Sequence, residues 1–161
     1  MKEKHTIRMK VLNTVGVMAR ITGLISQRGY NIDSIIATPS EADSVYTVHL
    51  VLTETEEKIE QISKQLNKLI DVLKVTDISH NKNYIVREFI MVKISTSRNR
   101  PDLLQIIDLF RAKVLDLASN YVVVSITGSP RKISRFIEAV QPFGIQELDR
   151  SGEFAVLDIQ H

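Results

Sequence analysis

The sequence predicts an α+β protein made of two tandem ferredoxin-like (βαββαβ) units. Short runs of alternating apolar and polar residues are interleaved with segments whose apolar residues recur at helical spacing. The order strand, helix, strand, strand, helix, strand occurs twice along the chain. Each helical segment carries a single apolar stripe, which suits helices that cover one face of an antiparallel sheet. A short polar stretch, His80–Asn83, separates the two series, so we expect domains at residues 1–80 and 84–161.

The first strand and helix flank an unusual loop. Residues 6–12 alternate apolar and polar side chains, which predicts a half-buried strand. Apolar residues from Val17 to Ile25 then recur at helical spacing, and this spacing leaves Arg20 facing solvent. Gly29 follows the last turn, where a left-handed cap commonly ends a helix.

Two strands and a second helix follow. Residues 31–38 and 45–53 predict strands joined by a turn at residues 39–43. Thr53 and Glu56 have capping-box spacing, so we expect a helix to begin there. Its apolar stripe comprises Ile59, Ile62, Leu66 and Leu69. A fourth strand over residues 72–79 completes the first unit.

The second series repeats this order without an obvious sequence repeat. A long strand is predicted at 84–95, and Pro101 suits the first turn of the helix after it. The remaining predicted elements are strands at 113–117 and 121–127, a helix at 130–141, and strands at 145–149 and 154–159.

Composition narrows the class of protein. Of the 161 residues, 43% are apolar and 25% are charged, which is ordinary for a globular protein. The absence of cysteine excludes disulfides, thiolate metal sites and cysteine nucleophiles. No apolar run approaches the ~18 residues that suggest a membrane span, and no signal-peptide pattern opens the chain. We therefore expect a cytoplasmic protein that does not contact membranes.

No constellation of residues predicts catalysis or metal binding. The four histidines, His5, His49, His80 and His161, lack the spacing of metal ligands. His49 lies mid-strand, where we expect it to face solvent or a neighbouring strand. The sequence contains no P-loop, GxGxxG or GxSxG motif. We expect neither catalytic residues nor a metal site in this chain.

Two basic clusters occur in the second half of the chain. Arg98 and Arg100 share a loop, and Arg131, Lys132 and Arg135 begin the last predicted helix. A helix N-terminus with nearby cations can hold an anion, but a solvated charged face explains both clusters better. The net charge is only +2 and the strands lack an aromatic run for base stacking, so no nucleic-acid binding is expected.

The best candidate site is the loop at residues 13–20, NTVGVMAR. Asn13 has a side chain that can cap the following helix, and Gly16 permits a positive φ or the close approach of a ligand. The N–H groups at a helix start attract a small anion. Apolar neighbours and the lack of a P-loop lysine favour a small apolar amino acid over a nucleotide. A purely structural cap explains the same pattern, and the residues alone leave both interpretations open.

Longer segments carry a family resemblance. NTVGVMARITGLISQRGYNIDSI resembles the opening of the ACT domain in the small regulatory subunit of acetohydroxyacid synthase, also called acetolactate synthase. QISKQLNKLIDVLKVTDI and REFIMVKI resemble the same family at the expected places, so the similarity spans nearly the whole chain.

The resemblance implies a non-catalytic regulator. In this family, ACT domains from two chains pair into a homodimer, and the effector, usually valine or another branched-chain amino acid, binds at their interface. One chain contributes the loop before its first helix, and the other contributes the start of its second strand. Carried onto this sequence, the effector-binding residues are Asn13, Gly16, Val17, Met18, Asn31 and Ile32. Relatives often carry an acidic residue where this chain has Leu12, which affects the expected contacts of the ammonium group.

The resemblance also implies a partner. The catalytic large subunit of such enzymes binds thiamine diphosphate, Mg²⁺ and FAD, whereas the small subunit binds none of them. The second domain is expected to contribute to dimerisation and to contact with the large subunit. The alternative function is an amino-acid-responsive transcription regulator built on the same domain. That function requires a DNA-reading element, and the N-terminal MKEKHTIRMK is too short to supply one beside the first strand.

Overall fold

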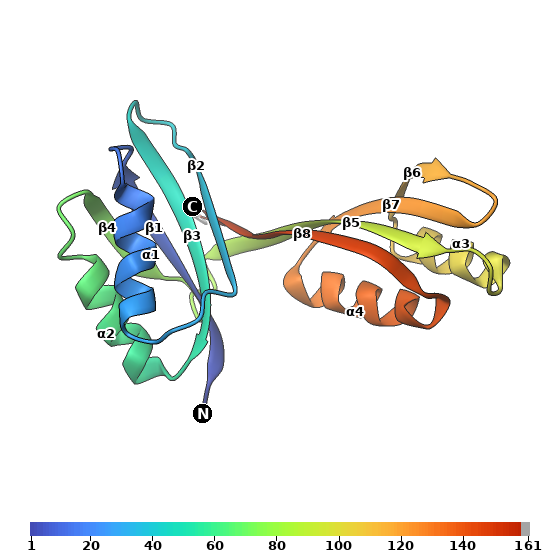
Figure 1. The fold of residues 1–161 in the computed structure, drawn as a ribbon, viewed down its shortest axis with the longest axis horizontal. Coiled ribbons are helices and arrows are strands. Elements are labelled where there is room, and N and C mark those ends of the chain that lie inside the picture. The colour runs from blue at the N-terminus through green and yellow to red at the C-terminus, as the bar shows by residue number, and fades with distance from the viewer. Residues whose placement is uncertain (159–161) are drawn as a thin grey trace. The chain divides into compact units, whose positions relative to one another are not determined.

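The computed structural model describes residues 1–158 and divides them into two compact units (Figure 1). The first unit comprises Met1–Ile85 together with the chain from Gly152 onward, and the second comprises Val86–Ser151. In chain order the elements are β1 (Glu3–Leu12), α1 (Val17–Gln27), β2 (Ser34–Pro39), β3 (Val45–Glu54), α2 (Glu56–Leu66), β4 (Val72–Asp77), β5 (Tyr84–Ser95), α3 (Arg100–Leu109), β6 (Lys113–Leu117), β7 (Tyr121–Gly128), α4 (Pro130–Val140), the 3₁₀ turn η1 (Gln141–Phe143) and β8 (Ile145–Leu157).

In the first unit, an antiparallel sheet of order β2-β3-β1-β4 is covered on one face by α1 and α2 (Figure 1). Ile7 and Met9 of β1 pair with Leu50 and Val48 of β3, and all four side chains are fully buried. The helices pack their apolar stripes onto this face. The helical part of this core is formed by Val17, Ile21, Ile25, Ile59, Ile62 and Leu66.

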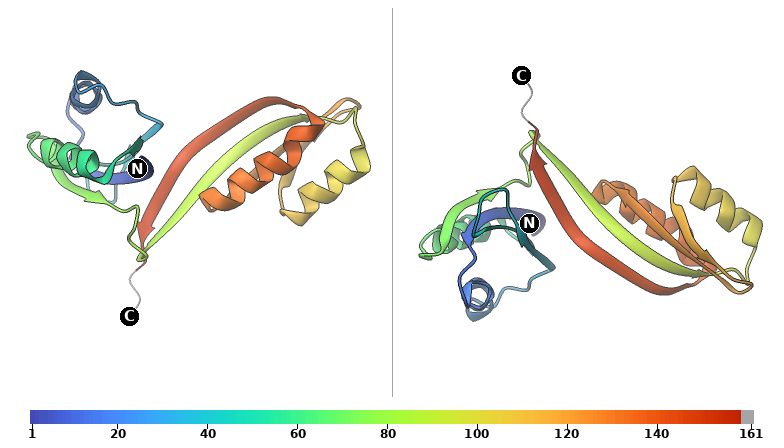
Figure 2. Two further views of the ribbon diagram at one scale, coloured as in Figure 1. Left: turned by 90° about the horizontal axis from the view of Figure 1, so that it is seen from below. Right: turned by 90° about the horizontal axis from the view of Figure 1, so that it is seen from above.

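In the second unit, the sheet order is β6-β7-β5-β8, and both views of Figure 2 place α3 and α4 on the same face of the sheet. Ile90, Val92 and Ile94 of β5 face these helices and are buried. Phe136 of α4 is fully buried and meets Phe110 edge to face at 5.3 Å between ring centroids. Because the two sheets have the same strand order, the prediction of two ferredoxin-like units is confirmed.

The second strand begins later than expected. The Gly29 N–H donates to Ser26 O at 3.0 Å, and Gly29 has φ of 74°, so it ends α1 as predicted. The chain then needs several residues to reverse direction before β2 starts at Ser34. Asn31 and Ile32 therefore lie in the loop between α1 and β2, and their assignment to the strand itself is wrong.

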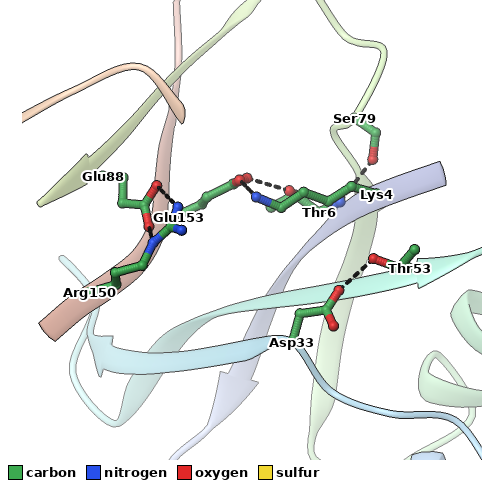
Figure 3. Close-up of polar contacts among 8 residues, drawn as sticks. All are labelled: Lys4, Thr6, Asp33, Thr53, Ser79, Glu88, Arg150 and Glu153. Carbon is green, nitrogen blue, oxygen red and sulfur yellow. Dashed lines mark hydrogen bonds and ion pairs between the residues drawn. The ribbon is translucent and has the colours of Figure 1, made fainter. Parts of the chain in front are cut away.

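The predicted capping box does not form. β3 remains paired with β1 as far as Glu54, so Thr53 is still a strand residue and α2 begins at Glu56 after Thr55. The Thr53 hydroxyl instead donates to Asp33 Oδ2 at 2.7 Å (Figure 3). The long register of the β1–β3 pair therefore overrides the local capping pattern.

The two predicted C-terminal strands form one strand, β8. The polar residues between them are satisfied within the second unit: Arg150 donates to both carboxylate oxygens of Glu88 (Figure 3), and Ser151 Oγ accepts from the Phe89 N–H at 3.0 Å. From Gly152 onward the chain belongs to the first unit. The expected second domain, 84–161, therefore differs from the observed second unit at its C-terminal end. Ile159 and His161 lie outside the described residues.

No helix within residues 1–158 is long and apolar enough to cross a membrane.

Candidate functional site

The start of α1 has no side-chain cap. The N-cap is Gly16, whose φ of 83° lies in the left-handed region that favours glycine. The Asn13 backbone N–H donates to Ser44 O at 2.8 Å, and no side chain accepts a hydrogen bond from the first turn. The expectation that Asn13 caps the helix is wrong, because three residues separate it from the first helical position. The first N–H groups of α1 lack intrahelical partners, and they lie at the positive end of the helix dipole.

Arg20 and Asp71 hold this loop in place. Arg20 Nη1 donates to Val15 O at 3.3 Å, and Nη2 donates to Thr14 Oγ1 at 3.2 Å and pairs with the Asp71 carboxylate. These contacts with Arg20, and a further one with Thr14, lower the pKa of Asp71. Arg20 is exposed, as the helical spacing predicted, and its guanidinium also holds the loop through these contacts.

The strand order is the one signal that could have predicted the ion pair between Arg20 and Asp71. β4 lies beside β1 in the sheet, with Val72 opposite Val11, so Asp71 is placed next to Leu12. The Leu12 N–H donates to Asp71 O at 2.8 Å, which fixes the backbone on both sides of the loop. The pairing of β4 with β1 would have predicted that Asp71 lies near this loop. The helical spacing around Arg20 alone could not predict that contact.

Gly16 leaves room beside the Arg20 guanidinium. A Cβ atom at this position would lie 3.1 Å from Arg20 Nη1. The Arg20 side chain is 44% exposed, so its guanidinium can reach a second carboxylate from solvent. The helix start thus combines backbone N–H groups with a guanidinium, both of which suit a carboxylate.

Val17 and Met18 support the loop from within the first unit. Val17 is 5% exposed, its side chain lies in the core, and its N–H donates to Thr14 O at 3.2 Å. Met18 is partly buried and packs against the same core. Val17 therefore positions the loop, whereas Met18 keeps some exposed surface at the helix start.

Asn31 and Ile32 follow the C-terminal end of α1, whereas Gly16 precedes its N-terminal end. The helix has 11 residues, which at 1.5 Å per residue places its ends about 16 Å apart. Asn31 is exposed, and Ile32 packs in part against the core. The two predicted groups are therefore not brought together within one chain.

At the helix starts beside the two basic clusters, a side chain already accepts a hydrogen bond from an N–H of the first turn. Asn99 accepts from the Asp102 N–H at the start of α3, and Ser129 accepts from the Lys132 N–H at 3.2 Å at the start of α4. Since side chains occupy both positions, the interpretation of these clusters as solvated charge is favoured over anion binding.

The histidines do not form a metal site within residues 1–158, where no group of three or more His, Asp or Glu side chains is arranged to hold a metal ion. His5 Nδ1 lies 3.1 Å from Asp77 Oδ2, within hydrogen-bond distance, so this histidine joins β1 to β4. His49 is only 4% exposed, so of the two positions expected for it, the one facing solvent is wrong and the one facing another strand is found. Its strand neighbours are Arg8 and Ile36, and β8 covers the ring, as described below.

Family models match both parts of the chain. Residues 7–74 match the AHAS small subunit-like ACT domain, and residues 87–158 match the small subunit of acetolactate synthase. The acetolactate synthase small subunit of Bacillus subtilis (strain 168) is 43% identical over 154 residues, which cover 94% of this chain and 89% of that protein. A probable acetolactate synthase small subunit of Archaeoglobus fulgidus is 34% identical, and the match covers 96% of each chain.

A solved structure matches over the same extent. The crystal structure of the acetolactate synthase small subunit from Thermotoga maritima covers 99% of each chain with a TM-score of 0.86 and 29% identity. The similarity includes both units, and residues 75–86, which lie between the two matched segments, contain the boundary at Ile85 and Val86. This chain belongs to the acetolactate synthase small-subunit family.

Proposed function

We propose that this chain is the non-catalytic regulatory subunit that activates an acetolactate synthase catalytic subunit and confers feedback inhibition by valine or another branched-chain amino acid. Family membership supports the role of a small subunit. The observation that carries the effector site is the start of α1, where uncapped N–H groups and Arg20 converge beside Gly16.

The proposed pocket is shared between two copies of the chain. One copy contributes Asn13, Gly16 and Met18 at the start of α1, and the other contributes Asn31 and Ile32. The distance of about 16 Å between the ends of α1 supports this arrangement, because one chain cannot supply both groups to one small ligand. A two-fold dimer would form two such pockets.

The strand order supports the same dimer. β2 is an edge strand of the first sheet, and it follows directly after Asn31 and Ile32. An edge strand presents unpaired N–H and C=O groups to which a second strand can add. Pairing of the ACT domains into a continuous sheet would therefore bring the loop of one copy toward the helix start of the other.

Each part of a branched-chain amino acid has a matching group. The carboxylate binds the Arg20 guanidinium and the first-turn N–H groups of α1 after Val17, whose own N–H donates to Thr14 O. The side-chain oxygens of Asn13 and the partner's Asn31 accept from the ammonium group. The branched side chain contacts Met18 and the partner's Ile32. Leu12 supplies no charge, and the carboxylate of neighbouring Asp71 is engaged by Arg20.

The chemistry of the reaction belongs to the catalytic subunit, which is expected to bind thiamine diphosphate, Mg²⁺ and FAD. In the second unit, the sheet face away from α3 and α4 exposes Phe89 and Met91, at 38% and 41%. We assign the second unit to dimerisation and contact with the catalytic subunit.

The direct test is reconstitution. The full chain is mixed with a purified acetolactate synthase catalytic subunit, and the rate of acetolactate formation is measured while valine, leucine or isoleucine is titrated. We expect the rate to rise on mixing and to fall with at least one of the three amino acids. A rate that neither rises on mixing nor falls with any of them would refute the proposal.

A further inference from the structure

The outer face of the first sheet is polar, yet part of it is buried. Residues on this face point away from α1 and α2, and in an antiparallel sheet covered on one side such positions normally meet water. Thr6 and His49 are only 5% and 4% exposed, and Val51, which pairs with Thr6 on this face, is 1% exposed. Some element of the first unit must therefore cover them.

The covering element is the end of β8, residues 152–157, which we name the strap. The carboxylate of Glu153 accepts from the Thr6 hydroxyl at 2.7 Å and forms an ion pair with Lys4 (Figure 3). Glu153 is itself 6% exposed. A buried carboxylate held by two donors is a specific anchor, because burial without these partners would be costly.

A second anchor lies on β3. The Ala155 N–H donates to His49 Nε2 at 3.1 Å, and the neighbouring Phe154 ring meets the His49 ring edge to face. Ala155 is 2% exposed. The Ala155 amide therefore reports directly whether the strap is docked on the sheet.

The third contact joins the strap to β2. Gly152 has φ of 83°, and a Cβ atom there would lie 3.0 Å from Ser34 Oγ and 3.1 Å from Ile36 Cδ1. Ser34 is the first residue of β2, and only Asp33 separates it from Ile32 in the candidate site. A shift in the segment that carries Asn31 and Ile32 would thus change the surface against which Gly152 packs.

We propose that the strap is the element through which effector binding at Asn31 and Ile32 is sensed: an ordered β2 favours the docked strap. This inference rests on the proposed function, since it requires an effector at that site. Its anchors are polar and few, which permits a docked and an undocked state with a small free-energy difference. β8 is also an edge strand of the second unit's sheet, so docking of the strap acts on a strand that both units share.

Coupling of this kind has measurable size and is reciprocal. Allosteric coupling ordinarily changes an affinity by about 5- to 150-fold, and each event affects the other by the same factor. Saturating valine should therefore slow hydrogen exchange at the Ala155 amide by about fivefold or more. A variant with an undocked strap should bind valine more weakly by the same factor.

The test uses the full chain with valine as the probe. Gly152→Ala places a Cβ against Ser34 and Ile36 at a positive φ and should release the strap. Glu153→Gln keeps the shape of the side chain but removes the charge that Lys4 and Thr6 bind. Val156→Thr, at a strap position that is 68% exposed, is the matched control. Valine affinity is measured by calorimetry, and strap docking by hydrogen exchange followed by mass spectrometry.

We expect Gly152→Ala and Glu153→Gln to speed strap exchange and weaken valine binding, and Val156→Thr to do neither. If the wild-type chain binds valine but strap exchange does not change, the strap inference fails and the proposed function stands. Wild-type affinity retained in both variants despite fast strap exchange would also overturn it. If the wild-type chain binds no branched-chain amino acid, the proposed function itself fails and the inference fails with it.

Discussion

The first helices of the two units begin in different ways, although the units share a strand order. α3 starts after Asn99, whose side chain accepts from the Asp102 N–H, with a proline and an acidic residue in the first turn. α1 starts after Gly16 and has no side-chain cap, no proline and no acidic residue in its first turn. At equivalent positions of the same fold, the N-terminus of α3 therefore has a side-chain cap and that of α1 has none.

The other two helices of the described chain support this contrast. α4 is capped by Ser129, and α2, although it lacks a side-chain cap, carries Glu56 and Glu57 in its first turn. Acidic residues and side-chain caps satisfy the dipole and the unpaired N–H groups of a helix start. Among residues 1–158, α1 alone lacks all of these features. This contrast is the reason that we propose its N-terminus, among the α-helices, as the binding position of an external carboxylate.

The largest expected effect comes from a carboxylate placed at each of the two helix starts. Gly16→Asp should weaken valine binding by about 100-fold, because it occupies the anion position with a like charge and removes hydrogen bonds to charged groups worth about 1.5–3 kcal/mol each. The added Cβ meets only the flexible end of Arg20, and aspartate is one of the residues that adopt a positive φ most readily, so the chain should fold with a modest loss of stability. Asn99→Asp, at the start of α3, is the matched control and should leave valine affinity unchanged. Equal affinities by calorimetry would place the effector elsewhere.

Two asparagines near these helices should separate stability from binding. Asn99→Ala removes a cap and should lower the free energy of unfolding by about 1 kcal/mol, with valine affinity unchanged. Asn13→Ala removes no cap, so it should leave stability nearly unchanged while it weakens valine binding about tenfold. Denaturant unfolding and calorimetry measure both quantities. If Asn13→Ala destabilises the chain as much as Asn99→Ala does, Asn13 is a structural residue.

The helix-covered face and the outer face of the first sheet each bury a histidine, His5 and His49, but the strap covers only the outer face, so docking of the strap should respond to pH through His49. Burial lowers the pKa of His49 from its ordinary 6.5, with Arg8 and Lys10 adding to the shift, while the contact of Nε2 with the Ala155 carbonyl oxygen and the charge of Glu153 oppose it. The docked strap therefore favours the neutral ring, and this stabilisation is present above pH 6.5 and is lost as the pH falls below it. Exchange at the Ala155 amide, corrected for its intrinsic rate, should speed up below about pH 6.5. His49→Phe should remove this dependence, and a dependence that persists would exclude His49 as its source.

The smallest effect is expected at the ion pair that holds the α1 loop. The contact with Arg20 lowers the pKa of Asp71, so its stabilisation is present above the ordinary value of 3.8 and is lost as the pH falls through the lowered pKa. Asp71→Asn should lower the thermal midpoint slightly at pH 7 and not at all well below the pKa of Asp71. The same substitution releases Arg20 from its carboxylate partner, so valine affinity should not fall. A large loss of valine affinity would instead assign Asp71 to the ammonium contact.

The sequence predicted the elements that local periodicity determines. Alternation in β1 and β5, the stripes of the helices and the turn at Gly29 all depend on neighbours within a few residues, and the structure contains each of them. The strand order followed from the element order and from single-stripe helices. Gly16 stood out because it permits a positive φ or the close approach of a ligand, and the structure shows the positive φ.

The remaining features depend on contacts between segments that are distant in sequence. Arg20 meets Asp71 only because β4 pairs with β1, and His49 is buried only because β8 returns to the first unit. The break predicted between the last two strands ignored the partners that Glu88 provides for Arg150. No local pattern encodes such partners, so the strap could not be predicted.

The proposed effector pocket is shared between two chains. One chain supplies the start of its α1, and the other supplies the loop that follows its α1. Gly16→Asp damages the helix-start half of the pocket, and Asn31→Lys places a positive charge near the ammonium position of the other half. Each variant alone should lose valine binding. When the two variants are co-expressed with different tags and the mixed dimer is purified, one pocket combines both damaged halves and the other combines both intact halves. We predict that calorimetry finds one valine site per mixed dimer with wild-type affinity, whereas no recovery of binding in the mixed dimer would contradict the shared pocket.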